Sequence, residues 1–407
     1  MGNEDYGGWE TGNTNGTTYG TEFVDYYNGM KAADPSILIG AVASPGATDY
    51  NDWTKDVLTA AKAGGVVPDF LIIHNYPGPY PAVGTLAGQE TQDQESLSYV
   101  LGDNLLESEV ASLNGIVTSV LGSSYVGKVR YFNTEFNINN GPTVASNTYI
   151  NAMFCSQYVL EAAQNGWIGA NLWAAENGGS PDFGFFNAST EKPYPNYYIY
   201  PMLTGKFGRN MVACTSSDTN IGAFAAKDSS GNLTLFFVNN YPSTIETASV
   251  TVSGFTPADS GSAWMMLPNG TSASGAPQEA PNLSINGNVN PVPATIASIA
   301  GEAQATGSTF SVSLQPNEMC LLVIPPKSVS PSPTRSVTAT DTRTVSPSAS
   351  PTPSSTRSPT PSVSVTPSRS STLSFTASPT ASPSATVSAS PTRSPSPMAT
   401  SSATFSA

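Results

Sequence analysis

Four short apolar runs alternate with stretches of helical periodicity, and this alternation limits the folds available to the chain more than any other feature. The runs cover residues 36–43, 69–76, 129–137 and 168–174. Helices are expected at 52–63, 106–120, 147–165 and 196–205. Continuous hydrophobicity is typical of strands buried on both faces, as in parallel sheets. Residues 1–208 are therefore predicted to form an α/β domain with a parallel sheet, either closed as a barrel or doubly wound.

The pattern changes at about residue 209. Ala248, Val250 and Val252 alternate with serine and threonine, which is the two-residue period of a half-buried strand. Residues 228–232, with the letters DSSGN, are typical of a hairpin turn. Residues 209–326 are therefore predicted to form a separate antiparallel domain, a β-sandwich.

The last segment, 327–407, consists almost entirely of serine, threonine, proline, alanine and valine with scattered arginine. Such a composition buries too little apolar surface to offset the chain entropy that is lost on folding. We predict a disordered tail, a stalk of the kind that carries O-linked glycans.

The charge of the chain is unevenly distributed. The formal net charge is −14, and residues 328–407 hold five arginines and one aspartate, so residues 1–327 carry a net charge of −18. This acidity argues against nucleic acid and anionic membrane as partners, because both require clustered lysine and arginine. The acidity fits a protein that binds a neutral polysaccharide or oligosaccharide. The alternative is that the charge only keeps the protein soluble. No run is long and apolar enough to predict a membrane span.

Five sites match the N-glycosylation pattern Asn-x-Ser/Thr: Asn15, Asn187, Asn232, Asn269 and Asn282. The three cysteines, Cys155, Cys214 and Cys320, show no spacing typical of a metal or redox site. The opening letters MGNEDYGGWE lack the basic and apolar stretches of a signal peptide. We therefore expect a secreted or cell-surface protein whose true N-terminus is absent from this sequence.

Polar residues stand at the ends of the apolar runs, where parallel strands display functional side chains. They are Asn3 and Glu4 near the start, then His74, Tyr76, Glu135 and Trp173. Two glutamates in one cleft suit glycosidic cleavage, because one carboxyl protonates the leaving oxygen while the other attacks the sugar. The alternative is a pair of ordinary strand-end carboxylates in surface ion pairs.

These motifs resemble those of the clan A retaining glycoside hydrolases. GNEDYGGWE resembles the Asn-Glu motif that ends the fourth barrel strand, which implies that Glu4 is the acid/base and that Asn3 binds the sugar 2-hydroxyl. YFNTEFN resembles the seventh-strand motif, which implies that Glu135 is the nucleophile. HNY resembles the sixth-strand pattern, in which His74 orders the site and Tyr76 hydrogen-bonds Glu135.

The resemblance implies a (β/α)8 barrel of the TIM type that is missing its first strands, followed by the β-sandwich. Residues 1–208 would then run from the end of strand 4 to helix 8. A complete barrel takes about 250 residues. On this basis the sequence is an N-terminally truncated fragment or a mis-started gene model.

Within the clan, the segments MKAADPSILIGAV, NDWTKDVL and PDFLIIHNYP are most similar to secreted α-L-arabinofuranosidases of glycoside hydrolase family 51. Families 39, 30 and 79 share the glutamate pair. The resemblance implies double-displacement cleavage of α-L-arabinofuranosidic linkages in plant or cell-wall polysaccharide. The alternatives are a clan A hydrolase of xylosides, glucosides or glucuronides, and an inactive cell-surface glycoprotein that binds carbohydrate.

Two further side chains are ambiguous. Trp173 either stacks on a sugar ring or packs inside the barrel, and Glu176 either contacts substrate hydroxyls or is a loop carboxylate. The sequence contains no metal-ligand cluster, phosphate-binding glycine loop or nucleotide motif. We therefore expect neither a cofactor nor a metal.

Overall fold

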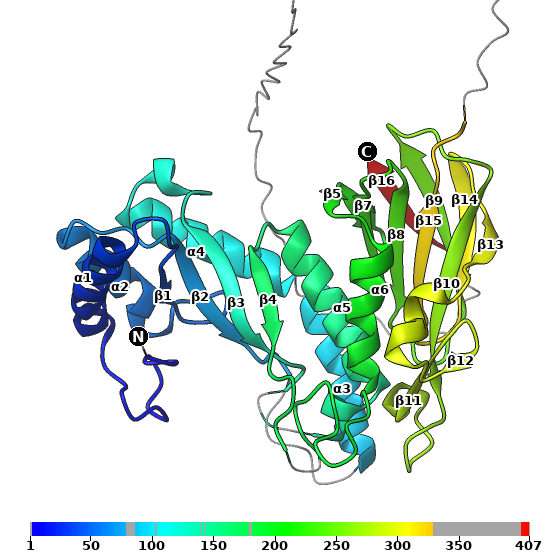
Figure 1. The fold of residues 1–407 in the computed structure, drawn as a ribbon, viewed down its shortest axis with the longest axis horizontal. Helices are drawn as coiled ribbons and strands as arrows, with labels where there is room; N and C mark the ends of the chain where they lie inside the picture. The colour runs from blue at the N-terminus through cyan, green and yellow to red at the C-terminus, as the bar shows by residue number, and fades with distance from the viewer. Residues whose placement is uncertain are drawn as a thin grey trace, which may run out of the picture. The chain divides into compact units, whose positions relative to one another are not determined.

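The computed structural model describes residues 2–78, 86–101, 104–139, 141, 143–178, 181–328 and 400–406. Its first part contains a four-stranded parallel sheet whose strands follow one another in chain order. The strands, side by side in Figure 1, are β1 (Gly40–Val42), β2 (Phe70–Asn75), β3 (Arg130–Phe136) and β4 (Gly169–Leu172). Each lies inside one of the four apolar runs, so the predicted parallel α/β sheet is confirmed.

The parallel sheet is open. Within the ranges given above, β1 and β4 are its two edges, and neither pairs with the other. A TIM-type barrel closes with eight strands. The described residues therefore form an open α/β sheet, and a closed barrel is not seen in them.

The α-helices that the structure describes are α1 (Gly16–Ala33), α2 (Trp53–Ala63), α3 (Leu86–Leu101), α4 (Leu105–Val120), α5 (Tyr149–Gln164) and α6 (Ile199–Lys206). Four of them match predicted helices, whereas α1 and α3 were not predicted. Helix α1 contains glycines, which weaken helix propensity. Gly20 has a packing role, because a Cβ there would lie 2.6 Å from the Val57 carbonyl oxygen of α2. Helix α3 is mainly polar and shows little apolar periodicity.

The second part of the chain is antiparallel, as its two-residue period predicts. The larger sheet has the order β12-β11-β10-β15-β8-β7-β5, with β13 paired to β10, and the smaller sheet has the order β14-β9-β16-β6. The strands are β5 (Asn210–Val212), β6 (Cys214–Ser216), β7 (Ile221–Lys227), β8 (Leu233–Asn239), β9 (Glu246–Ser253), β10 (Ser260–Asn269), β11 (Asn282–Ile285), β12 (Asn288–Val289), β13 (Glu302–Ala305), β14 (Thr309–Leu314), β15 (Met319–Ile324) and β16 (Thr400–Ser406). The predicted turn at 228–232 joins β7 to β8, with Gly231 in the left-handed region at φ +82°.

Strand β16 belongs to the segment for which the composition predicts disorder. It pairs in parallel with β9 and antiparallel with β6. Residues 398–407 lack the prolines that recur through the rest of the tail, and proline cannot donate to a strand ladder. The remainder of the predicted stalk, residues 329–399, lies outside the described residues.

The α/β region and the antiparallel region share one hydrophobic core. Helix α5 contacts β4 on the parallel sheet and β5 and β7 on the larger antiparallel sheet. Phe154 of α5 belongs to the same buried cluster as Phe236 and Met266. The Tyr149 hydroxyl lies 2.7 Å from the Met266 carbonyl oxygen and 2.8 Å from that of Asn317. The described residues up to 328 and β16 therefore belong to one compact unit. A second buried cluster, which includes Leu235, Val250 and Leu322, joins the two antiparallel sheets.

No helix among the described residues is long and apolar enough to cross a membrane.

The cysteines of this unit are buried. Cys155, Cys214 and Cys320 are buried free thiols, and burial raises the pKa of each. Raised thiol pKa values oppose thiolate formation, so these cysteines are suited to packing and not to nucleophilic chemistry.

The substitution Tyr149→Phe should destabilise the unit by roughly 1–3 kcal/mol, because it removes the single hydroxyl hydrogen that two buried carbonyl oxygens share. Urea denaturation followed by circular dichroism measures this loss. Tyr26→Phe is the matched control, since the Tyr26 side chain is exposed. Equal stabilities for Tyr149→Phe and the unmodified protein would contradict the shared-core interpretation.

Candidate active site

The predicted site residues meet in one cleft at the carboxyl ends of the parallel strands. The cleft has a volume of about 1070 Å³, at the upper end of the range for small-molecule sites. Six of the seven predicted residues line it: Asn3, Glu4, His74, Tyr76, Glu135 and Trp173. The seventh, Glu176, is exposed and is not one of the lining residues.

Asn3 and Glu4 lie in a series of turns and not at the end of a strand, contrary to the resemblance. Glu4 has a φ of +46°, which is incompatible with extended backbone, and its carbonyl accepts the Gly7 N–H at 2.7 Å. Asn3 Nδ2 donates to Glu10 Oε1 at 3.0 Å. The tight turn folds the Glu4 carboxylate back towards the ends of β2 and β3.

His74 lies between the two glutamates. Its Nδ1 is 2.9 Å from Glu4 Oε1 and 3.5 Å from Glu135 Oε2. Its Nε2 is 2.9 Å from the Thr134 hydroxyl oxygen. A carboxylate only accepts hydrogen bonds, so Nδ1 carries a hydrogen, and in the neutral ring Nε2 accepts from Thr134. Both ring nitrogens are therefore fixed by partners in the cleft.

The spacing of the carboxylates defines the chemistry that they can perform. One oxygen of Glu4, one oxygen of Glu135 and a ring nitrogen of His74 all lie within 4.8 Å of one another. Retaining glycosidases hold their carboxyl groups about 5–5.5 Å apart, whereas inverting enzymes need roughly 6.5–9.5 Å to admit a water. The spacing suits direct attack by one carboxylate on a sugar.

Hydrogen bonds hold Glu4 in its ionised form. The pKa of Glu4 is below its ordinary value, chiefly because His74 donates to it; partial burial opposes this shift, and the Trp9 indole reinforces it. Trp9 Nε1 donates to Glu4 Oε2 at 2.7 Å. Both oxygens of the Glu4 carboxylate thus have a donor in the unliganded cleft.

Tyr76 is a hydrogen-bond donor to Glu135. Its hydroxyl donates to Glu135 Oε2 at 2.9 Å. Burial raises the pKa of Tyr76, and the negative charge of Glu135 raises it further. Tyr76 therefore stays neutral and remains a hydrogen-bond donor to the carboxylate.

An irregularity in β3 brings two consecutive side chains to His74. In a regular strand, neighbouring side chains point to opposite faces of the sheet. Thr134 and Glu135 nevertheless both contact His74. The strand register shifts at Ile73/His74 against β2, and again between Asn133 and Phe136 against β4. Such bulges re-aim side chains beside active sites.

Two carboxylates and an imidazole also form a ligand set that transition metals accept. Metal binding requires a free lone pair on an imidazole nitrogen. In the neutral His74 ring, Nδ1 donates to Glu4 and the Nε2 lone pair accepts from Thr134. The hydrogen bonding therefore favours organic acid–base chemistry over metal binding at this cluster.

Trp173 follows β4 and presents a partly exposed indole to the cleft, with 42% of its surface accessible. The peptide bond between Trp173 and Ala174 is cis. Asn137 fixes this segment, because its Nδ2 donates to the carbonyl oxygens of Trp173 at 2.6 Å and Phe183 at 3.2 Å. An exposed indole in a cleft is a surface on which a sugar ring can stack.

Sequence reasoning assigned no role to Asn137 and did not identify Trp9 and Thr134 as hydrogen-bond partners of the site. Asn137 and Thr134 lie within two residues of Glu135, so their position was a signal, but their partners come from distant segments of the chain. The Trp9 contact depends on the turn at Glu4, which the sequence pattern does not specify.

No protein-family model matches this chain, and no curated protein is similar to it in sequence. Similar solved structures do exist. The α-L-arabinofuranosidase of Thermotoga maritima, solved as an arabinose complex, aligns with 17% identity and a TM-score of 0.58, covering 80% of this chain and 65% of that one. A family 51 α-L-arabinofuranosidase of Bifidobacterium longum aligns with 16% identity and a TM-score of 0.57, covering 80% and 66%.

The family 44 endoglucanase of Clostridium thermocellum aligns with 14% identity and a TM-score of 0.55, covering 77% of this chain and 62% of that one. The chain thus spans less than two thirds of the length of these proteins. The structural neighbours are family 51 α-L-arabinofuranosidases and other glycoside hydrolases. At this identity the likeness establishes the fold, an α/β unit with a parallel sheet followed by an antiparallel region.

The substitution Trp9→Phe should raise the pKa of Glu4, because it removes a donor that stabilises the ionised carboxylate while it keeps an aromatic ring in place. Carbon-13 NMR of glutamate-labelled protein, with the Glu4 signal assigned by Glu4→Gln, measures the titration. Trp173→Phe is the control, since that indole follows β4 and lines the same cleft. A Glu4 pKa that is unchanged in Trp9→Phe would contradict the described hydrogen bond.

Proposed function

We propose that this protein is a retaining glycoside hydrolase in which Glu135 is the nucleophile and Glu4 is the acid/base. The observation that carries the proposal is the approach of the two carboxylates to within 4.8 Å across His74. A surface ion pair does not explain this geometry, because both partners are acidic and both line the same cleft. The similarity in fold to glycoside hydrolases supports the proposal independently.

We further propose that β1–β4 correspond to the last four strands of an eight-stranded barrel. Three observations support this assignment. His74, Glu135 and Trp173 lie at the carboxyl ends of β2, β3 and β4, where barrel enzymes place their catalytic groups. An antiparallel region follows the sheet, and the aligned neighbours cover 77–80% of this chain.

The resemblance of the two sequence motifs to those of clan A hydrolases distributes the chemical roles. Glu135, which accepts a hydrogen bond from the Tyr76 hydroxyl, attacks the anomeric carbon. Glu4 transfers its proton to the glycosidic oxygen as the bond to the leaving group breaks. In the second half of the reaction, Glu4 takes a proton from water, and the resulting oxygen nucleophile displaces Glu135 from the sugar. Both carboxyl groups then return to their starting states.

The cleft offers further groups for sugar binding. The Trp173 indole suits stacking on a sugar ring, and the Asn3 amide lies beside Glu4, where it can reach a hydroxyl next to the anomeric carbon. We take an α-L-arabinofuranosidic linkage as the first candidate substrate, since the structural neighbours include α-L-arabinofuranosidases. Xylosides and glucosides are the second candidates, because an endoglucanase and a bifunctional glucanase-xylanase share the fold.

A panel of aryl glycosides tests the proposal directly. Glu135→Gln should lower the turnover of the hydrolysed glycoside by at least about 10⁴-fold, since the nucleophile is lost. Glu4→Gln should lower it by roughly 10²–10⁴-fold for a poor leaving group, and much less for dinitrophenyl glycosides, which need no protonation to leave. Glu176→Gln is the control, because Glu176 is exposed outside the cleft lining.

Full activity in Glu135→Gln would remove the nucleophile from the proposal. Covalent labelling by a 2-fluoro glycoside inhibitor adds a second readout, in which mass spectrometry should locate the sugar on Glu135. A carbohydrate-binding protein without catalytic activity would bind the same sugars and would not be labelled.

Turnover should be highest at acid pH. The acid/base must carry a proton in the first step, and the pKa of Glu4 lies below its ordinary value of 4.5 in the unliganded protein. The protonated fraction of Glu4, and with it kcat/KM, should therefore fall as the pH rises through that lowered pKa. A kcat/KM profile that instead increases towards neutral pH would contradict the role of Glu4.

A further inference from the structure

A buried carboxylate on α4 lies behind the cleft, outside the two-carboxylate chemistry. Glu109 is 1% exposed. One of its oxygens accepts a hydrogen bond from the backbone N–H of Gly46, and the other accepts one from Asn75 Nδ2 at 2.7 Å. Gly46 and Asn75 both line the cleft, as does Leu105, one helical turn before Glu109. Glu109 is therefore joined to the cleft wall although it is not itself a lining residue.

The Asn75 amide extends this connection to β3. Asn75 Nδ2 also donates to the Tyr158 hydroxyl at 3.0 Å, and Asn133 Nδ2 donates to the same hydroxyl at 2.6 Å. Asn75 stands between the two residues of β2 that contact the catalytic carboxylates, and Asn133 lies two residues before Glu135. We call Glu109, Asn75, Tyr158 and Asn133 the rear network, because they lie behind the strand ends that carry the site.

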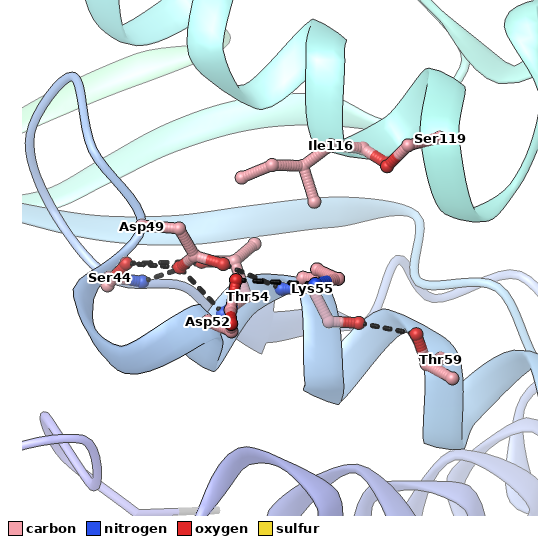
Figure 2. A network of polar contacts seen from close by, with 8 residues as sticks. All are labelled: Ser44, Asp49, Asp52, Thr54, Lys55, Thr59, Ile116 and Ser119. Atoms are coloured by element: carbon pink, nitrogen blue, oxygen red, sulfur yellow. Dashed lines mark hydrogen bonds and ion pairs between the residues drawn. The ribbon is translucent and has the colours of Figure 1, made fainter.

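The β1–α2 loop is the part of the cleft wall that Glu109 holds through Gly46. Figure 2 shows how the far end of this loop is fixed. Asp49 accepts hydrogen bonds from the Ser44 hydroxyl at 2.7 Å and from the backbone N–H groups of Thr54 and Lys55 at 2.8 and 2.9 Å. These bonds satisfy free N–H groups at the start of α2. The loop thus has one anchor at residue 49 and a second at residue 46.

The two contacts of Glu109 require two acceptor oxygens, because both partners are donors. A carboxyl group has two oxygens that can accept, whereas a glutamine presents one acceptor and one donor. Burial raises the pKa of Glu109 to about 7, while the hydrogen bonds from Gly46 and Asn75 oppose that rise. The groups that face Glu109 from the neighbouring elements are the Gly46 N–H, the Asn75 amide and, one bond further, the Tyr158 hydroxyl.

We infer that Glu109 is a positioning residue, which holds the end of β2 and the β1–α2 loop so that the side chains of β2 reach the two catalytic carboxylates. The effect of Glu109 on catalysis rests on the proposed function. The contacts through which Glu109 positions β2 and the loop are present in the unliganded protein. Loss of one acceptor contact releases the loop at Gly46 or the amide at Asn75. A displacement of about 1 Å at a catalytic group lowers rates by as much as roughly 100-fold.

His74 gives this inference a direct test, because it is the only histidine in the chain and lies in the site. With nitrogen-15-labelled histidine, the two ring nitrogens give signals that report the hydrogen bonds to Glu4 and Thr134 without any substrate. Glu109→Gln should shift these signals. Glu107→Gln is the matched control, since it makes the same change at an exposed position of the same helix.

Activity on the hydrolysed aryl glycoside is the second readout. Glu109→Gln should lower kcat/KM by about 10- to 100-fold, with Glu107→Gln unchanged. If Glu109→Gln does not fold, Tyr158→Phe removes the hydroxyl of the rear network and keeps the ring that stacks on Phe136 at 4.2 Å. It should shift the His74 signals in the same way.

The inference would be overturned if Glu109→Gln gave the same His74 signals as the unmodified protein. Where Tyr158→Phe replaces Glu109→Gln, the same outcome in Tyr158→Phe would overturn it. The His74 signals test the positioning role even if the unmodified protein hydrolyses no glycoside. Absence of hydrolysis would overturn the proposed function and leave the positioning role unaffected. Altered His74 signals combined with undiminished kcat/KM would equally overturn the positioning role in catalysis.

Discussion

The structure of the site depends on one constraint, the placement of two carboxylates within 4.8 Å of each other. At that distance two ionised carboxylates repel each other by about 3.5 kcal/mol at an effective dielectric constant of about 20, before screening by water in the open cleft. Hydrogen-bond donors must offset this repulsion. His74, Trp9 and Tyr76 supply them, and each donates to a carboxylate oxygen that faces the cleft.

Different elements hold these donors. Trp9 follows the turn of Glu4, whereas His74 and Tyr76 come from successive inward positions at the end of β2. Glu135 and Thr134 reach the same histidine because the register of β3 shifts beside them. Behind the strands, the rear network ties β2 to β3, to α4 and to the β1–α2 loop. The spacing of Glu4 and Glu135 thus depends on the register of β2 and β3 and on the hydrogen bonds of the buried Glu109 carboxyl group.

The parts of the fold that depend on local patterning were predictable from the sequence. Continuous apolar runs predicted the four parallel strands, and the change of period at about residue 209 predicted the antiparallel region. Four of the site residues that line the cleft, His74, Tyr76, Glu135 and Trp173, lie at strand ends, and strand ends of a parallel sheet meet at one edge. Asn3 and Glu4 reach the same cleft from a turn. Glu176 also follows a strand, but the chain after Trp173 turns it out to solvent.

The features that were missed depend on contacts between distant segments. Helix α1 owes its stability to packing, because Gly20 allows a close approach to α2 that helix propensity does not reveal. Glu109 occurs in a helix with ordinary periodicity, where a glutamate normally marks the exposed face, and only its partners on β2 and the β1–α2 loop show that it is buried. The left-handed turn at Glu4 is likewise invisible in a motif that resembles a strand end.

The central claim is that two closely spaced glutamates act by double displacement. Proton NMR of the reaction mixture, recorded before the released sugar equilibrates between its anomers, measures this most directly. The claim predicts that the first-formed sugar has the same anomeric configuration as the hydrolysed glycoside, because two successive displacements restore it. A first-formed product of inverted configuration would contradict it.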